Sequence, residues 1–96
     1  MLRHVVLFRL VNRDIDHIKK VADVLKSLEK KIDLVKSLEV GIDFMKLDRS
    51  YDIVFISSFL NRKDLQKYQD HEAHKPVKQY MGEVCESIVS VDYETN

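Results

Sequence analysis

The sequence has little of several residue types: its 96 residues include one cysteine, one proline and two glycines. A single cysteine, Cys85, excludes a disulfide within the chain and fits a reducing compartment. The scarcity of glycine and proline leaves little room for linkers or disordered segments. The longest apolar runs have four residues, whereas a membrane-spanning helix needs about 20. We therefore expect no membrane partner.

The sequence also lacks an excess of either charge. Sixteen basic and sixteen acidic residues give a formal net charge of zero, and the two signs are interspersed. This pattern excludes the basic patch that nucleic acids require, and low net charge favours self-association. Near the N-terminus, Arg3, His4 and Arg9 interrupt the apolar core that a secretory signal would need. We expect a cytoplasmic protein that does not bind nucleic acid.

No repeat, low-complexity tract or shift in composition divides the chain, so we expect one domain over residues 1–96. Segments rich in Val, Ile, Leu and Phe, or alternating between apolar and polar residues, predict strands at residues 4–10, 37–44, 51–60 and 88–93.

Apolar residues at spacings of three and four predict a helix over residues 14–32. Asn61, followed by Asp64, predicts the start of a second helical region. Pro76 suits the first position of a further helix, whose apolar spacing continues to Ile88.

The resulting order, β-α-β-β-α-β, predicts a ferredoxin-like α+β sandwich with the first and third strands in the middle of the sheet. These two strands are apolar on both faces, but helices can cover only one face of an open sheet. The other face would expose an apolar patch, which soluble monomers rarely tolerate. We therefore predict a homodimer that forms through the sheet faces.

Five segments along the chain, MLRHVVLFRL, KSLEVGID, RSYDIVF, YQDHEAHKPV and VSVDYE, together resemble the stress-responsive dimeric α/β-barrel (Dabb) domain family. The resemblance implies a ferredoxin-like subunit that forms a dimeric α/β barrel with its mate and holds a small cavity between sheet and helices. Many members have no assigned reaction. Some plant relatives look like polyketide cyclases, in which a tyrosine and a histidine act as acid and base on an aromatic precursor.

Four residues match the family's pattern: His4, Tyr68, His71 and His74. The family often has His-Pro-x-His where this chain has His71-Glu72-Ala73-His74, a departure that affects the turn at His71 more than His74. The candidate catalytic residues are His74, Tyr68 and His4. The candidate ligand-binding residues are His71, Tyr80, Met81, Val84 and Phe8.

The chemistry of these residue types fits acid–base work. A histidine with a pKa of about 6.5 can take a proton near neutral pH, and a tyrosine hydroxyl can stabilise the oxyanion that develops. His4 shares the strand face of Val6 and Phe8, so it can line one cavity with Tyr68 and His74. A histidine on an apolar face can equally be a structural residue bonded to the backbone.

A metal site is the weaker interpretation of these histidines. His71 and His74, three residues apart on a helix, can reach one metal, but a zinc or iron site needs a third ligand, and none stands at a diagnostic spacing. We expect no metal and no cofactor.

Three functions remain open. The first is a dimer that binds a small, partly apolar, aromatic molecule without catalysis. The second is a cofactor-free lyase or isomerase that resembles a polyketide cyclase and uses His74 with Tyr68 and His4. The third is a monooxygenase, a chemistry that other dimeric α/β-barrel proteins perform.

Overall fold

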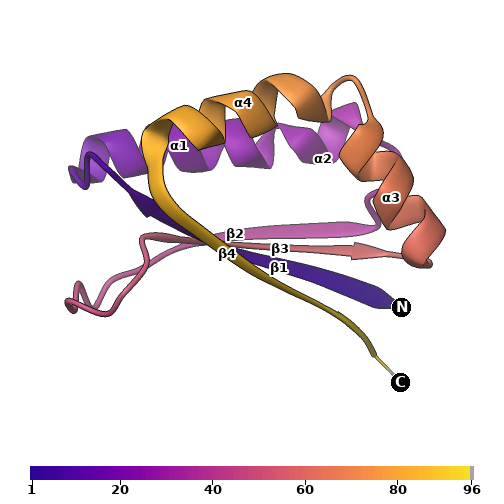
Figure 1. The fold of residues 1–96 in the computed structure, drawn as a ribbon, viewed down its shortest axis with the longest axis horizontal. Helices are drawn as coiled ribbons and strands as arrows, with labels where there is room; N and C mark the ends of the chain where they lie inside the picture. The colour runs from indigo at the N-terminus through magenta and orange to yellow at the C-terminus, as the bar shows by residue number, and fades with distance from the viewer. Residues whose placement is uncertain (96) are drawn as a thin grey trace.

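The computed structural model describes residues 1–95 and contains one antiparallel sheet with helices on one side (Figure 1). The strands are β1 (Leu2–Leu10), β2 (Ser37–Ile42), β3 (Ile53–Phe59) and β4 (Cys85–Glu94). The helices are α1 (Ile15–Lys26), α2 (Leu28–Lys31), α3 (Arg62–Asp70) and α4 (His74–Val84). No helix in this part of the chain has the length and apolarity needed to cross a membrane.

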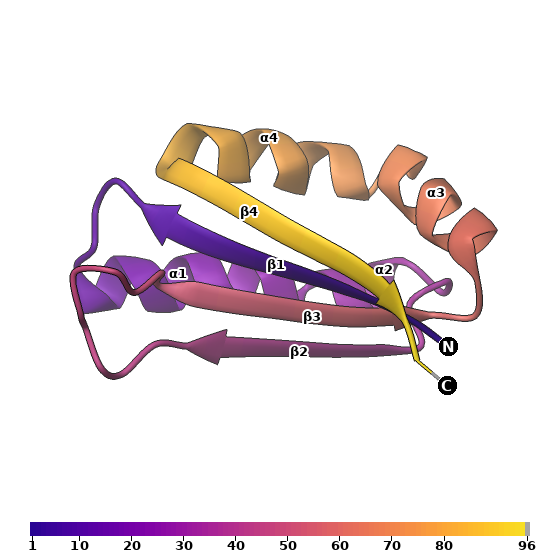
Figure 2. The same cartoon turned by 60° about the horizontal axis from the view of Figure 1, so that its bottom comes forward.

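The strand order is β2-β3-β1-β4, which confirms the ferredoxin-like α+β fold and places β1 and β3 in the middle (Figure 2). Both central strands are paired along both edges, so their side chains are covered more completely than those of the edge strands. The two ends of the chain lie side by side, where the backbone N–H of Thr95 donates to the carbonyl of Met1 at 2.8 Å.

The first helical region differs from the prediction because it is interrupted at Ser27. The Ser27 hydroxyl donates to the carbonyl of Val24, three residues earlier, at 2.6 Å. A side chain that bonds to the helix backbone in this way competes with the regular ladder. The apolar face nevertheless continues across the break, with Leu25, Leu28 and Ile32 all buried.

The second helical region begins as predicted, since the Asn61 side chain accepts from the backbone N–H of Asp64 at 2.8 Å. However, α4 begins at His74, two residues before Pro76. Proline is tolerated at the third helical position because the first four N–H groups of a helix have no partner within it. The helix also ends at Val84 rather than near Ile88, because Cys85 pairs with Leu10 and starts β4.

The core lies between the sheet and the helices. Alternate residues of β1 point toward the helices, and they are buried: Leu2, His4, Val6, Phe8 and Leu10. They meet the buried faces of α1, α3 and α4, which contribute Ile18, Val21, Ala22, Leu25, Leu65, Tyr68, Val77 and Met81. His4 is thus the one ionisable side chain that β1 places in the core.

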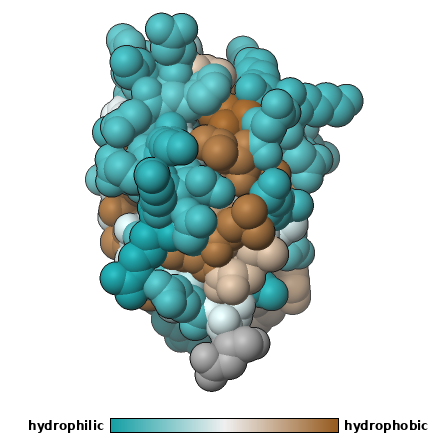
Figure 3. Space-filling model, turned by 90° about the vertical axis from the view of Figure 1, so that its right-hand side faces the viewer, coloured by the Kyte–Doolittle hydropathy of each residue, from teal (hydrophilic) through white to brown (hydrophobic). Residues whose placement is uncertain are grey.

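No helix of residues 1–95 lies over the opposite face of the sheet (Figure 2). Cross-strand pairing gathers six apolar residues there, which we call the open sheet face: Val5, Leu7, Val54, Ile56, Val89 and Val91. The side chains on β4 are the most exposed, with Val91 at 56%. Apolar side chains also reach the surface between hydrophilic ones at the end of the molecule where α3 lies (Figure 3).

Candidate functional site

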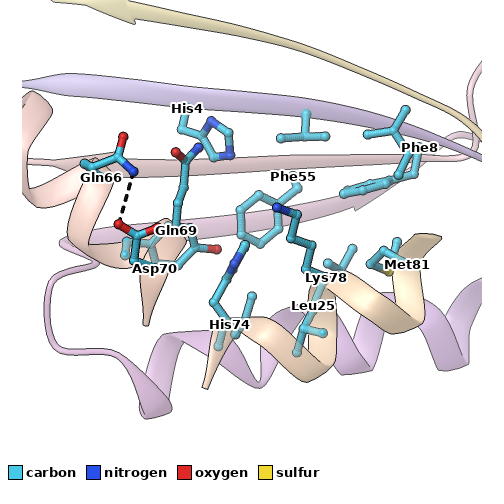
Figure 4. A pocket seen from close by; sticks show the side chains of 15 residues that line it. His4, Phe8, Leu25, Phe55, Gln66, Gln69, Asp70, His74, Lys78 and Met81 are labelled. Carbon is cyan, nitrogen blue, oxygen red and sulfur yellow. Dashed lines mark hydrogen bonds between the residues drawn. The ribbon is translucent and has the colours of Figure 1, made fainter. Parts of the chain in front are cut away.

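A cavity of about 400 Å³ lies between the sheet and the helices and opens to the surface. Its volume falls within the roughly 300–1,000 Å³ that is usual for small-molecule sites. Strands β1 and β3 form one wall, and helices α3 and α4 form the opposite wall (Figure 4). The apolar lining consists of Val6, Phe8, Leu25, Leu28, Phe55, Val77, Met81 and Ile88. The cavity is therefore suited to a ligand with substantial apolar surface.

Four polar residues that the sequence analysis did not single out also line the cavity: Gln66, Gln69, Asp70 and Lys78. The Gln66 amide donates to the Asp70 carboxylate at 3.2 Å. Lys78 extends from α4 into the same space (Figure 4). Helical spacing was an available signal for Lys78, because it stands four residues after His74 and on the same face.

His74 stands in the first turn of α4 and points into the cavity (Figure 4). Its ring centroid lies 4.6 Å from that of Tyr68. Its Nδ1 atom is buried and has no hydrogen-bond partner within residues 1–95. Burial lowers the pKa of His74 below its ordinary value of 6.5; the backbone of Gln69 opposes this lowering in part, and the positive charge of Lys78 adds to it. His74 is therefore a neutral imidazole near neutral pH.

The lowered pKa of His74 predicts a pH-dependent stability. The unfolded imidazole binds a proton near pH 6.5 and the folded one does so only at lower pH, so the free energy of unfolding should fall as the pH drops below 6.5. Chemical denaturation from pH 8 to 5 measures this trend. A His74→Gln variant should lose less stability over that range than the wild type; an equal loss in both proteins would contradict the prediction.

Tyr68 lies beneath His74 and is almost completely buried, with 1% of its surface exposed. Its ring packs against Phe59 at a centroid distance of 5.0 Å. Burial raises the pKa of the Tyr68 hydroxyl far above its ordinary value, because the charged phenolate would be poorly solvated there. Tyr68 therefore remains a neutral phenol, which can donate a hydrogen bond but does not readily give up its proton.

His4 completes the group from the sheet side. Its ring centroid lies 6.4 Å from those of both Tyr68 and Phe55, and its Nδ1 atom is hydrogen-bonded to the Asp92 carboxylate. Asp92 stands directly opposite His4 on β4. The three candidate catalytic residues thus line one cavity, with Tyr68 between the two histidines.

The candidate ligand-binding residues divide into two groups. Phe8 and Met81 line the cavity, whereas His71, Tyr80 and Val84 do not. His71 lies in the turn between α3 and α4, where its Nδ1 accepts from the backbone N–H of Ala73 at 3.0 Å. Tyr80 and Val84 pack against the core outside the cavity lining. The family resemblance did not predict which way the His71 side chain points. In the structure it is bonded to the turn and does not line the cavity.

The described part of the chain bears on two further kinds of site, a metal-binding cluster and a reactive thiol. Within residues 1–95, no three His, Cys, Asp or Glu side chains are placed to hold a metal ion. Burial raises the pKa of the Cys85 thiol to about 11, and the negative charge of Asp52 adds to the effect. Because the thiolate is the nucleophilic form, Cys85 is unreactive near neutral pH.

Comparison with known proteins agrees with this architecture. The family model described as the stress responsive A/B barrel domain (Dabb) matches residues 2–95. None of the curated proteins matches the sequence.

Several solved structures have the same fold. A dimeric protein of unknown function from Bacteroides fragilis is 27% identical, with a TM-score of 0.81 over 98% of this chain and 95% of that one. A hydroxynitrile lyase from Passiflora edulis is 20% identical, with a TM-score of 0.85 over 99% and 93%. An antibiotic biosynthesis monooxygenase is 16% identical, with a TM-score of 0.75 over 100% and 99%.

Proposed function

Since the chain belongs to the stress responsive A/B barrel domain family, we propose that it binds a small, partly apolar, aromatic molecule in the cavity between its sheet and helices. The observation that carries this proposal is the cavity of about 400 Å³, which opens to the surface and brings His4, Tyr68 and His74 together beside an apolar wall.

Lys78 narrows the chemistry of the ligand. It lines the cavity, and within residues 1–95 it forms no ion pair. Asp70, the acidic residue in the lining, instead accepts from Gln66. A ligand with a carboxylate or an acidic phenol would place its negative charge beside Lys78, while its aromatic ring packed against the apolar wall of the cavity. We therefore favour aromatic acids and phenols over neutral compounds.

Acid–base catalysis on the bound molecule is the second candidate function, and the grouping of His4, Tyr68 and His74 favours it. A neutral imidazole, a neutral phenol and a histidine paired with a carboxylate supply both proton donors and acceptors. The lyase from Passiflora edulis has the same fold, and this supports a cofactor-free lyase or isomerase. The monooxygenase with this fold makes oxygen chemistry a weaker candidate, since no cavity residue favours it specifically.

A thermal-shift screen tests the binding proposal. Aromatic acids, phenols and matched neutral compounds are added to the wild type and to His74→Gln. We expect acidic aromatic compounds to stabilise the wild type by about 2.7 kcal/mol at a concentration a hundredfold above Kd. The same compounds should bind the His74→Gln variant with a Kd at least tenfold higher. His71→Ala is the matched control, because this histidine lies outside the cavity. The proposal fails if no compound stabilises the wild type, or if both variants respond alike.

We also propose that two copies pair through the open sheet face. Within residues 1–95, no element covers the six apolar residues of this face, and water-exposed apolar area of this kind favours association. The Bacteroides fragilis protein, which has this fold, is dimeric. A two-fold arrangement would bury the same face of both copies.

A further inference from the structure

We propose that His4, held by Asp92, is the proton acceptor of the cavity, and that His74 binds the ligand as a neutral group. The inference rests on the proposed function of the same cavity and assigns its base. Asp92 does not line the cavity, so its role is to position His4 rather than to touch the ligand.

The first support is the hydrogen bond between Nδ1 of His4 and the Asp92 carboxylate. A carboxylate only accepts hydrogen bonds, so the proton of the neutral imidazole must reside on Nδ1. The lone pair then resides on Nε2, the nitrogen farther from the backbone. Asp92 thus selects the tautomer in which the outer nitrogen can accept a proton.

The second support is the surroundings of Nε2. His4 lines the cavity (Figure 4), and within residues 1–95 its Nε2 forms no hydrogen bond. The buried side-chain polar atoms that lack a partner in this part of the chain are Ser57 Oγ and His74 Nδ1. Nε2 of His4 is therefore accessible, and the accessible space beside it is the cavity.

The third support is the contrast between the two histidines. His4 has a carboxylate partner, the hydrogen-bonded side chain of Asp92. His74 forms no ion pair within residues 1–95, and Lys78 stands four residues after it on α4. Of these two rings, His4 is therefore the one whose tautomer is fixed by a carboxylate in the described part of the chain.

The step that follows is proton abstraction from a carbon acid or a phenol. The C–H or O–H bond of the ligand breaks, an N–H bond forms at Nε2 of His4, and the electron pair remains on the ligand as an enolate or phenolate. The Tyr68 hydroxyl and Lys78 lie on the same cavity and can stabilise this anion. Return of the proton at another atom of the ligand completes an isomerisation.

The tautomer of His4 tests the role of Asp92 without any ligand. Long-range ¹H–¹⁵N correlation spectra at pH 8 distinguish the two neutral forms. We expect the Nδ1–H form of His4 in the wild type and a shift to the Nε2–H form in Asp92→Asn, whose amide can donate to Nδ1. Asp70→Asn is the control and should leave the tautomer unchanged. A wild-type Nε2–H form, or the same tautomer in the wild type and Asp92→Asn, would overturn the inference.

Deuterium exchange tests which histidine is the base. The probe is phenylpyruvate, a small aromatic oxo acid whose CH₂ protons exchange through the enol, in D₂O. We expect the wild type to accelerate exchange, His4→Gln to abolish the acceleration, and Asp92→Asn to slow it by about tenfold to a hundredfold. His74→Gln should raise the probe concentration needed for half-maximal exchange without abolishing exchange at saturation, and His71→Ala, outside the cavity lining, is the control that should retain the activity. Loss in His74→Gln but not in His4→Gln, or no acceleration by the wild type, would overturn the assignment. A rise in melting temperature with phenylpyruvate reports separately on binding, and hence on the proposed function.

Discussion

Replacing Asp52 with alanine should lower the free energy of unfolding by about 3 kcal/mol, because a buried carboxylate with several partners is removed. Asp52 is 1% exposed. Its Oδ2 accepts from the backbone N–H of Leu10 at 2.8 Å, and its Oδ1 accepts from Nε of Arg13 at 3.0 Å. Without this carboxylate, the backbone N–H of Leu10 and the guanidinium of Arg13 lose their bonds to it. Both groups lie where β1 ends and the loop before α1 begins.

Urea denaturation of Asp52→Ala and Asp52→Asn measures this contribution. The asparagine oxygen can still accept from Leu10, so Asp52→Asn should lose only the attraction to Arg13 and cost less than the alanine variant. Asp48→Ala is the control, since Asp48 is an exposed acid in the neighbouring loop. A domain of this size has only about 5–15 kcal/mol of stability, so the effect should be easily measured. A cost below about 1 kcal/mol for Asp52→Ala would contradict the role assigned to this carboxylate.

Replacing Leu7 with glutamate should convert the proposed homodimer into monomers. Leu7 stands in the middle of the open sheet face, between Val54 on β3 and Val89 on β4. A two-fold interface would bury two such glutamates, and each buried carboxylate without a partner costs several kcal/mol. The side chain is already 37% exposed in the single chain, so the substitution should disturb the subunit itself much less than the interface.

Light scattering after size exclusion, at micromolar concentration, gives the result directly. The wild type should have twice the chain mass of 11.3 kDa and Leu7→Glu the mass of one chain. Ile15→Glu is the control because Ile15 is similarly exposed, at 42%, but lies on α1 on the helical side. A wild-type mass of one chain, or a dimer that persists in Leu7→Glu, would refute pairing through the open sheet face.

The sequence predicted the order and type of the elements well because strand and helix patterns are local. The alternation in residues 37–44 and the apolar run in residues 51–60 both correspond to strands. The predicted strands are two and three residues longer than the observed β2 and β3. The errors lie at element ends. The apolar spacing from Val77 continues to Ile88 by coincidence, but pairing of Cys85 with Leu10 ends the helix four residues earlier. Such pairing with a distant strand leaves no local signal.

The sequence also placed His4 on the face of β1 that turned out to meet the helices, because the period of a strand fixes which residues share a face. It could not say which face the helices would cover. Nor did it indicate that Gln66 and Gln69 line the cavity, since polar residues on a helix are usually solvated. The rotation of α3 and α4 about their axes, set by packing of Leu65, Tyr68 and Met81 in the core, decides this.

By itself, the sequence determined the ferredoxin-like succession of strands and helices, the apolar surplus of the sheet and the candidate residues His4, Tyr68 and His74. Only the tertiary structure decided how these residues differ from one another. His4 is hydrogen-bonded to the carboxylate of Asp92, 88 residues away in the chain. His74 instead lies beside Tyr68, and its buried Nδ1 has no hydrogen-bond partner within residues 1–95. The two imidazoles are chemically identical in the sequence, and the charge and burial that surround each ring in the folded chain make them different.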